Sequence, residues 1–444
     1  MICIEEIAKI TKAEILSAPE NLLDKNITNF STDTRTIKKD DFYIPLKGER
    51  FDGEKFIDKA IENGAIGYFT TDNTIIDGVV ALKVPDTKKA YLELANYRRN
   101  QINPQVIMIT GSSGKTTTKE LVYSVCSQKY KTVKTPLNHN NEIGFCQTVF
   151  SINEDTQILI IEAGMRGLGE IELISKYAEP NISIISNVGT AHIGRLGSRE
   201  NIAKAKCEIT KFQKPNGILI AHNDELIKQT TDYTGEKIYY SLSDTKIINK
   251  KIGYSKYEYK NDIYELNIEG DYNVENSLAA IEVGKRLDIE YNLIAQGLRN
   301  YKPIEKRWEI EKIGGYNIIN DSYNANPDSM IAATNTILDL YENIVIVLGD
   351  MGELGENENF YHKKVGKFIN NKNKPNAKIL TVGNASKNIS DEIKVCFTKH
   401  FQTNEDVARY ILANIEIGTT IFLKASRSMK FEEILTYLKG ENKW

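Results

Sequence analysis

The chain has 444 residues, which is too long for one ordinary domain and favours two or three. Its hydrophobic fraction of 41% and charged fraction of 26% are typical of a globular protein, and its formal net charge of −3 gives no basis for nucleic-acid binding. The five scattered cysteines, odd in number and never spaced as Cys-x-x-Cys, argue against a disulfide framework or a zinc site.

The elements expected in chain order fall into three blocks. Residues 1–102 mix short helical and strand patterns and predict a small mixed α/β domain. Residues 103–303 predict a doubly wound parallel sheet, because apolar runs at 106–109, 158–161, 182–185 and 217–220 alternate with helical stretches. Residues 304–444 predict a Rossmann-like α/β domain, with strands at 317–319, 344–348, 378–382 and 420–423 and a helix at 405–414. Polar connectors at 100–105 and 300–305 separate the blocks.

A glycine-rich loop follows the first buried strand of the central block. Its residues are Gly111, Ser112, Ser113, Gly114, Lys115, Thr116 and Thr117. Glycines allow backbone N–H groups to face phosphate oxygens, and the helix that follows adds its positive N-terminal end. Lys115 is expected to reach the outer phosphates of ATP, and the Thr116 hydroxyl to bind Mg²⁺. Ile109 stands where the full pattern has glycine, but the flanking strand and helix favour a phosphate site over a plain turn.

Polar side chains follow two further strands of the predicted sheet. Glu162 follows the run at 158–161, and His192 comes shortly after the run at 182–185. Because the carboxyl ends of parallel strands share one sheet edge, Glu162 is a candidate Mg²⁺ ligand rather than a surface residue, and His192 a candidate functional residue. Lys206, read without context, is a solvated helical lysine.

Together these motifs resemble the ATP-dependent Mur ligase family, the amide-bond-forming enzymes of peptidoglycan synthesis. The resemblance rests on residues 110–118, Glu162, residues 187–192 (Asn-Val-Gly-Thr-Ala-His) and residues 205–208 (Ala-Lys-Cys-Glu), and it covers nearly the whole chain. Residues 135–144, 321–327 and 348–355 are similar to the branch that joins D-alanyl-D-alanine to UDP-N-acetylmuramoyl-tripeptide. Within that branch, Asn320 replaces the first of two aspartates that many members carry.

The resemblance implies a role for each matching residue. Lys115, Glu162, His192 and Lys206 would be catalytic; Lys206, carbamylated by CO₂, and His192 would hold a second Mg²⁺ beside the one on Thr116 and Glu162. ATP would also contact Asn273, Asn276, Arg307 and Asp321. The residues that would bind the UDP-linked peptide and the incoming amine are Thr34, Arg35, Lys47, Gly48, Asn138, Asn141, Asn326, Lys424, Ser426 and Arg427.

Three alternatives are weighed against this interpretation. A sister ligase that adds a diamino acid usually carries an Asp-Asn-Pro-Arg signature, whereas this chain has Ala325-Asn326-Pro327-Asp328. Folylpolyglutamate synthetase shares the scaffold but would not need the Ser-Thr-Asp-Thr-Arg segment at 31–35. A nucleotide-dependent binding protein that has lost ligation would not need Lys115, Glu162, His192 and Lys206 together.

We also expect a cytoplasmic protein that works as a monomer. The sequence shows no long apolar segment near its start and no run of about 20 apolar residues, so it predicts neither a signal peptide nor insertion into a membrane. The isolated cysteines suit a reducing compartment.

Overall fold

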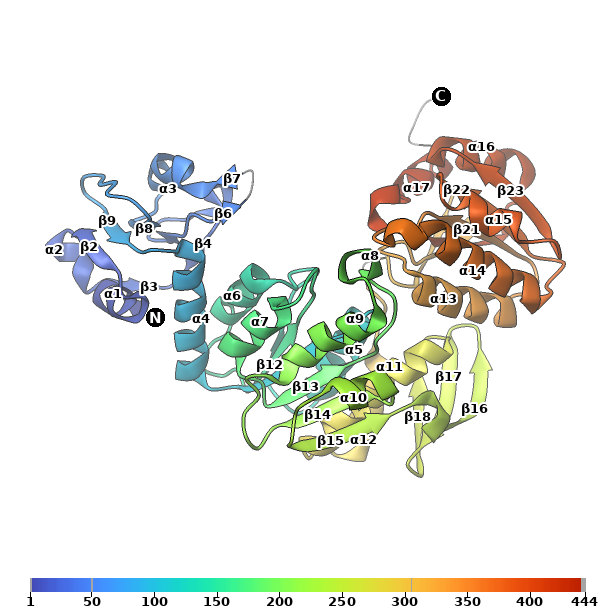
Figure 1. Cartoon of the computed structure of the whole chain (residues 1–444), viewed down its shortest axis with the longest axis horizontal. Coiled ribbons are helices and arrows are strands. Elements are labelled where there is room, and N and C mark those ends of the chain that lie inside the picture. Colours follow the sequence, from blue (N-terminus) through green and yellow to red (C-terminus); the bar gives the residue numbers. More distant parts are fainter. Residues whose placement is uncertain (1, 49–50, 305, 441–444) are drawn as a thin grey trace. The chain divides into compact units, whose positions relative to one another are not determined.

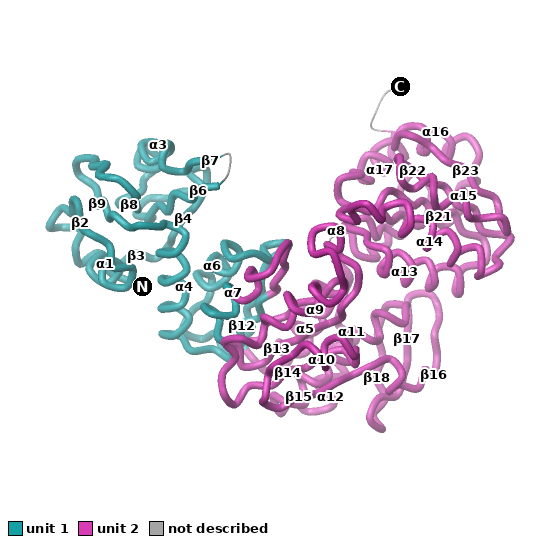
Figure 2. The backbone as a smooth tube through the Cα atoms, viewed as in Figure 1, with its two compact units in different colours: residues 1–106, 131–161, 173–179 teal, residues 107–130, 162–172, 180–444 magenta. Residues whose placement is uncertain are grey.

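The computed structural model describes residues 2–48, 51–304 and 306–440 of the chain (Figure 1). These residues form two compact units (Figure 2), and each is described by itself. Unit 1 contains residues 1–106, 131–161 and 173–179, and unit 2 contains residues 107–130, 162–172 and 180–444, apart from the positions outside the described ranges. The candidate catalytic residues Lys115, Glu162, His192 and Lys206 all belong to unit 2.

The N-terminal part of unit 1 is a small mixed domain, as predicted. Its five-stranded sheet has the order β2-β9-β8-β5-β4, parallel except for β2, which runs antiparallel to β9. Tyr43, Tyr68 and Ala81 lie in its buried core. Its elements are β1 (Ile2–Cys3), α1 (Ile4–Thr11), β2 (Glu14–Ser17), α2 (Glu20–Leu23), β3 (Asn26–Ile27), β4 (Phe30–Ser31), β5 (Phe42–Tyr43), β6 (Lys47–Gly48), β7 (Phe51–Asp52), α3 (Ile57–Glu62), β8 (Gly67–Thr70), β9 (Val80–Lys83) and α4 (Thr87–Ile102).

The central sheet has six strands in the order β11-β12-β10-β13-β14-β15. The pairs β11–β12, β10–β13, β13–β14 and β14–β15 are parallel, as their buried isoleucine-rich runs predict. The elements of this region are β10 (Gln105–Thr110), α5 (Lys115–Cys126), β11 (Thr132–Lys134), α6 (Glu142–Phe150), β12 (Ile158–Glu162), α7 (Glu170–Ala178), β13 (Ile182–Ile185), α8 (Ile193–Leu196), α9 (Arg199–Cys207), β14 (Ile218–His222), α10 (Glu225–Thr230) and β15 (Glu236–Tyr240).

A three-stranded antiparallel sheet and two helices follow in unit 2. The sheet consists of β16 (Thr245–Lys251), β17 (Tyr254–Tyr259) and β18 (Asp262–Leu266), and the helices are α11 (Asp271–Arg286) and α12 (Tyr291–Asn300). The sequence analysis did not predict this sheet. Charged residues interrupt its strands, and only alternate positions of β17 are buried, so no continuous apolar run identifies it.

The C-terminal domain has a six-stranded sheet of order β19-β20-β24-β21-β22-β23. Five of these strands are parallel, and the edge strand β19 is antiparallel to β20. Val347, Leu380 and Leu423 lie in its buried core. Its elements are β19 (Glu309–Ile313), β20 (Tyr316–Asn320), α13 (Pro327–Leu340), β21 (Ile344–Gly349), α14 (Glu358–Lys372), β22 (Lys378–Val382), α15 (Lys387–Asp391), β23 (Phe397–Phe401), α16 (Asn404–Asn414), β24 (Thr420–Lys424) and α17 (Glu432–Leu438).

The three-part α/β architecture predicted from the sequence is therefore confirmed, with one correction at a connector. The stretch 100–105 is not an open linker: α4 continues to Ile102, Asn103 ends it with φ 50°, and β10 begins at Gln105. Asn103 takes the left-handed conformation that asparagine tolerates, so the helix ends just before Pro104 rather than at Asn100. The second connector follows α12, and its last residue, Glu305, lies outside the described residues. The domain boundaries at 102 and 303 stay predictions.

Within the described ranges, no helix is both long and apolar enough to span a membrane.

Candidate active site

The glycine-rich loop joins the carboxyl end of β10 to the start of α5, as predicted. Gly114 caps α5 with φ 74°, a conformation that favours glycine, and a Cβ atom there would lie 2.5 Å from Asn276 Oδ1. A Cβ atom on Gly111 would lie 1.8 Å from Ser186 Oγ. The first N–H groups of α5 have no acceptor within the helix, so they are suited to bind an anion.

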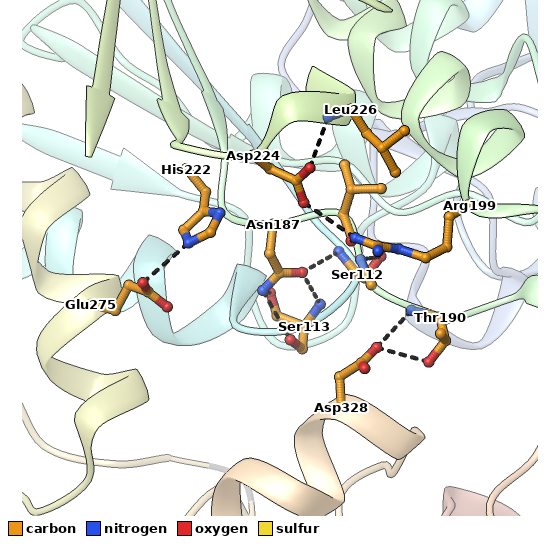
Figure 3. Close-up of polar contacts among 12 residues, drawn as sticks. Ser112, Ser113, Asn187, Thr190, Arg199, His222, Asp224, Leu226, Glu275 and Asp328 are labelled. Atoms are coloured by element: carbon orange, nitrogen blue, oxygen red, sulfur yellow. Dashed lines mark hydrogen bonds and ion pairs between the residues drawn. The ribbon is translucent and has the colours of Figure 1, made fainter. Parts of the chain in front are cut away.

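Asn187, at the end of the adjacent strand β13, fixes the shape of this loop (Figure 3). Its Oδ1 accepts hydrogen bonds from the backbone N–H groups of Ser112 at 3.1 Å and Ser113 at 3.0 Å. Its Nδ2 donates to Ser113 O at 3.1 Å and Ser113 Oγ at 2.9 Å. One amide side chain thus satisfies both serines, and the loop keeps the turn that presents the start of α5.

We predict that Asn187→Ala weakens nucleotide binding. Ser113 N–H would lose its acceptor and Ser112 N–H would keep only the backbone carbonyl of residue 187, at 3.2 Å. At about 1–3 kcal/mol in total, the dissociation constant for ADP should rise about 10- to 100-fold. Calorimetric titration with ADP measures this change. The matched control is Asn223→Ala, since Asn223 is an exposed asparagine directly after the next strand, β14. Equal affinities in the two variants would contradict the role of Asn187.

Glu162 is the last residue of β12 and lies buried beside the loop. The Thr116 hydroxyl donates to Glu162 Oε2 at 2.9 Å, so the two predicted Mg²⁺ ligands are brought together. Lys119 Nζ, on the same face of α5, lies 3.4 Å from Glu162 Oε2 and 3.4 Å from Glu120 Oε1. The side chains of Glu162 and Lys119 are 2% and 0% exposed, so this is a buried ion pair.

The charges around Glu162 keep it ionised. Burial raises the pKa of Glu162, but the nearby positive charges of Lys119, Lys115 and Arg307 outweigh burial and lower it below its ordinary value. The Lys115 Nζ donates to Gly111 O at 2.8 Å. Burial lowers the pKa of Lys115, which the charge of Glu162 partly offsets. Lys115 and the ionised Glu162 are therefore close enough at the phosphate loop for each charge to influence the other.

Lys206 lies on α9 and is only 1% exposed, so its interpretation as a solvated lysine is wrong. The helix turns this residue inward, whereas Lys204 on the same helix is exposed. Burial and the nearby charge of Lys115 lower the pKa of Lys206 well below its ordinary value, which favours a neutral amine. The effect of Lys115 places the two lysines within electrostatic reach of each other.

Arg307 and Asp321 come from the C-terminal domain. The Arg307 guanidinium lies 3.8 Å above the ring of Tyr323, and its charge helps to lower the pKa values of Lys115 and Glu162. Asp321 Oδ2 lies 2.5 Å from the buried Lys424 Nζ. The sequence analysis assigned Asp321 to ATP and Lys424 to the amine, and the structure joins them in one ion pair.

The two asparagines assigned to the adenine region differ in their contacts. Asn276, on α11, packs against the phosphate loop, and its Oδ1 accepts from the Thr118 hydroxyl at 3.4 Å. Asn273 donates to Glu269 O at 2.7 Å. Between them in sequence, Glu275 Oε1 lies 3.1 Å from His222 Nε2 and ties α11 to the end of β14 (Figure 3).

The His222–Glu275 pair should make stability depend on pH. Burial lowers the pKa of His222, but the hydrogen bond to Glu275 outweighs it and raises the pKa above the ordinary 6.5. The stability that His222 contributes is therefore complete below pH 6.5 and is lost as pH rises through its folded pKa. A partly exposed pair contributes about 1 kcal/mol to the free energy of unfolding. At pH 6, His222→Gln should therefore lower the melting temperature by about 2 °C.

The melting curves of the two proteins should converge at pH values above the folded pKa of His222. The melting temperature of Glu275→Gln should also approach that of the wild type as pH rises, because this substitution removes the partner that raises the pKa of His222. A difference that stays constant at all pH values above 6.5 would contradict the assignment.

His192 is the residue before α8, in the left-handed conformation with φ 63°. Its Nδ1 lies 2.5 Å from Oε2 of Glu353, in the loop after β21. Beside it, Thr190 donates from both its N–H and its hydroxyl to Asp328 Oδ2, at 2.7 Å each (Figure 3). Two carboxylates of the C-terminal domain thus contact the segment that carries His192.

The remaining C-terminal candidates have structural contacts of their own. Asn326 caps α13 by accepting from Ser329 N at 2.9 Å, and its Nδ2 lies 3.4 Å from Ser112 O. Ser426 is buried, and its N–H donates to Asp350 O at 3.0 Å. The Arg427 side chain is 57% exposed and pairs with Glu432.

The candidates in unit 1 lie on the surface or near it. Arg35 pairs with Asp33 at 2.7 Å, and this hydrogen bond lowers the pKa of Asp33 to about 2. Lys47 and Gly48 are exposed on β6. The other candidates in this unit are Thr34, whose carbonyl accepts from Asn63; Asn138, which is exposed; and Asn141, which caps α6.

Four residues with evident roles were missed from the sequence. Asn187, Asp328 and Glu353 stand inside quoted motifs but received no role. Lys119 lies three residues after Thr116 on one helix face. The i, i+3 spacing of Thr116 and Lys119 is the one signal that could have predicted a shared contact. No group of three or more His, Cys, Asp or Glu side chains suited to a metal occurs within the part of the chain that the structure describes.

The phosphate loop lies at a sheet edge, its Thr116 contacts the buried Glu162, and Asn326 of a second α/β domain contacts the loop at Ser112. These features define a class, the ATP-using enzymes of the P-loop type with an appended domain. Three family models match the chain: the Mur ligase family catalytic domain at residues 26–106, the Mur ligase middle domain at 109–284, and the Mur ligase glutamate ligase domain at 306–427. The chain belongs to the Mur ligase family.

Named relatives match over nearly their full length. The chain is 36% identical to the UDP-N-acetylmuramoyl-tripeptide–D-alanyl-D-alanine ligase of Bacillus subtilis, over 92% of each chain. Its fold is similar to that of MurF from Acinetobacter baumannii, with a TM-score of 0.90, 27% identity and 99% of each chain covered. A Thermotoga maritima MurF ligase crystallised with ADP matches with a TM-score of 0.84 and 25% identity, over 94% of this chain and 99% of that one.

Proposed function

We propose that this chain is the ATP-dependent ligase that joins D-alanyl-D-alanine to UDP-N-acetylmuramoyl-tripeptide. The observation that carries the proposal is the buried Thr116–Glu162 contact at the phosphate loop, which suits a metal-bound triphosphate. The relatives that share this reaction in their names match along nearly the whole chain. ATP is required because a carboxylate has no usable leaving group at neutral pH.

The reaction is expected to proceed in two steps. The terminal carboxylate of the tripeptide attacks the γ-phosphorus of ATP, which forms an acyl phosphate and releases ADP. The amine of D-alanyl-D-alanine then attacks the activated carbonyl, and the tetrahedral intermediate expels inorganic phosphate as the amide forms. Water must be kept from the acyl phosphate, which favours closure of the C-terminal domain over the loop.

The residues at the loop fit a bound Mg²⁺. The Thr116 hydroxyl and the ionised Glu162 carboxylate offer the oxygen ligands that Mg²⁺ prefers, and Mg²⁺ usually adds substrate phosphates and water to one or two carboxylates. When bound, the ion neutralises negative charge on the transferring phosphoryl group. Lys115, whose Nζ donates to Gly111 O, would bind the outer phosphates, and the start of α5 would orient them.

Lys206 fits carbamylation by CO₂, because that reaction requires a neutral amine. Its burial and the charge of Lys115 both favour the neutral form. The carbamate would turn the buried neutral amine into an anionic oxygen ligand, and with His192 it would serve a second Mg²⁺. The expected monomeric state and cytoplasmic location stay predictions; light scattering during size-exclusion chromatography checks the first.

The direct test is ADP release by the purified protein with each candidate amine and UDP-muramoyl peptide. Release should require both the tripeptide and D-alanyl-D-alanine. ¹⁸O placed in the tripeptide carboxylate should appear in the released phosphate. Unlabelled phosphate would contradict the acyl phosphate, and turnover independent of the amine would favour a nucleotide-dependent binding protein instead.

A further inference from the structure

Residues 190–195 of the central domain are held from two sides by the C-terminal domain. Asp328 accepts two hydrogen bonds from Thr190, and the backbone N–H of Gly194 donates to Glu353 O at 3.0 Å. A Cβ atom on Gly194 would lie 2.4 Å from the backbone N of Gly355, so the two backbones are in direct contact. The segment therefore has little freedom to shift while the C-terminal domain is docked on it.

The side chain of Glu353 completes this contact at the His192 ring. Glu353 Oε2 lies 2.5 Å from His192 Nδ1, and Arg195 Nε lies 3.6 Å from Glu353 Oε1. An ionised carboxylate has only acceptor oxygens, so Glu353 Oε2 at this distance presents an acceptor to Nδ1. An acceptor at Nδ1 requires the proton on that nitrogen, which leaves the Nε2 lone pair available.

We infer that Glu353 is a positioning residue, which orients the His192 ring and selects the tautomer whose Nε2 can bind a cation. The inference rests on the proposed function of His192 as a ligand to the second Mg²⁺. Carboxylate–histidine–metal arrangements of this kind fix the ring and strengthen the ligand. Because Glu353 belongs to the C-terminal domain, His192 becomes a competent ligand only when that domain is docked.

The loop that carries Glu353 is itself fixed by a buried histidine. The N–H of Met351 donates to His362 Nε2 at 3.0 Å, and the opposite ring nitrogen of His362 lies 2.8 Å from Glu358 O. Asp350, at the start of the loop, accepts from the N–H groups of Asn384 and Ser386 at 2.9 and 2.7 Å. The side chain of Glu353 is 39% exposed, so water screens its charge and its effect is mainly geometric.

The test is the ¹⁵N spectrum of the histidine rings in the metal-free full-length protein. The chain has five histidines, and His192→Gln identifies the signals of His192. At about pH 9, where imidazoles are neutral, the wild type should show the Nδ1–H tautomer at His192. Glu353→Ala should shift it to the Nε2–H tautomer, whereas Glu353→Gln, which keeps an acceptor oxygen, should retain Nδ1–H.

Glu356→Ala is the matched control, since Glu356 is exposed, lies three residues further along the same loop region and removes the same charge. Its spectrum should equal that of the wild type. A wild-type ring with Nε2–H, or a Glu353→Ala ring that keeps Nδ1–H, overturns the inference.

Magnesium dependence gives the second measurement. The Mg²⁺ concentration for half-maximal ligation should rise about 10- to 100-fold in Glu353→Ala, while the KM for the tripeptide changes little. An unchanged Mg²⁺ response counts against Glu353. If the wild type performs no ligation but shows the expected tautomers, the proposed function fails and the positioning contact stands. If the wild type ligates and the His192 tautomer is the same with and without Glu353, only this inference fails.

Discussion

Replacing Lys206 by alanine should abolish ligation, with a fall in kcat of about 10³-fold or more, equivalent to about 4 kcal/mol of transition-state stabilisation. The physical reason is that the carbamate would be an anionic ligand whose removal leaves the second Mg²⁺ without one of its protein ligands. Amine-dependent ADP release measures the effect. A short-chain carboxylate added to Lys206→Ala should restore part of the activity, because it can occupy the space and carry the charge of the missing group.

Lys204→Ala is the control for this prediction, because Lys204 lies on the same helix but is exposed. It should keep wild-type activity. Rescue of Lys206→Ala by carboxylates but not by amines of similar size would support the carbamate. A folded Lys206→Ala protein that ligates normally, or one that no carboxylate rescues, would count against it.

Glu162→Gln should lose activity and stability together, for two separable reasons. The neutral amide is a poor Mg²⁺ ligand, so kcat/KM should fall about 10²- to 10⁴-fold, or about 3–5 kcal/mol. The substitution also removes a charged partner of Lys119, which is fully buried, and breaking a buried pair costs about 3–5 kcal/mol of folding free energy. Thermal or denaturant unfolding measures this second effect.

The double variant Glu162→Gln, Lys119→Met separates the two effects. It replaces Lys119, which in the single variant still pairs with Glu120, by an apolar side chain of similar length, so stability should return toward that of the wild type. Activity should stay low, since the Mg²⁺ ligand is still missing. Recovery of both would show that Glu162 serves the fold alone; recovery of neither would show that Lys119 is not its main partner.

The fold was predictable wherever apolar runs mark buried parallel strands. The strands expected at 182–185 and 378–382 coincide with β13 and β22, because both faces of these strands are covered. The sheet of β16, β17 and β18 was not predictable in the same way. Only alternate residues of β17 are buried, and the half-buried Lys256 and Glu258 stand next to the buried Tyr257 and Tyr259.

The site was predictable where chemistry and strand ends coincide. Thr116 and Glu162 meet as expected, because the carboxyl ends of parallel strands converge at one sheet edge. The contacts made by Asp328 and Glu353 could not be predicted from the sequence. Asp328 lies 138 residues from Thr190 and Glu353 lies 161 residues from His192, and both contacts depend on how two domains dock. Lys206 shows a third limit: helical residues two positions apart, such as Lys204 and Lys206, can face solvent and core respectively.

The hydrogen bonds of Asn187 to Ser112 and Ser113 have a consequence for how quickly nucleotide can be exchanged. Ordering the backbone of one residue costs about 1–2 kcal/mol of conformational entropy. Because these bonds form within the chain, the backbone of both serines is already ordered when the protein folds, before any phosphate binds. Nucleotide association then requires no slow rearrangement of the loop, and departing ADP leaves behind a loop already shaped for the next ATP.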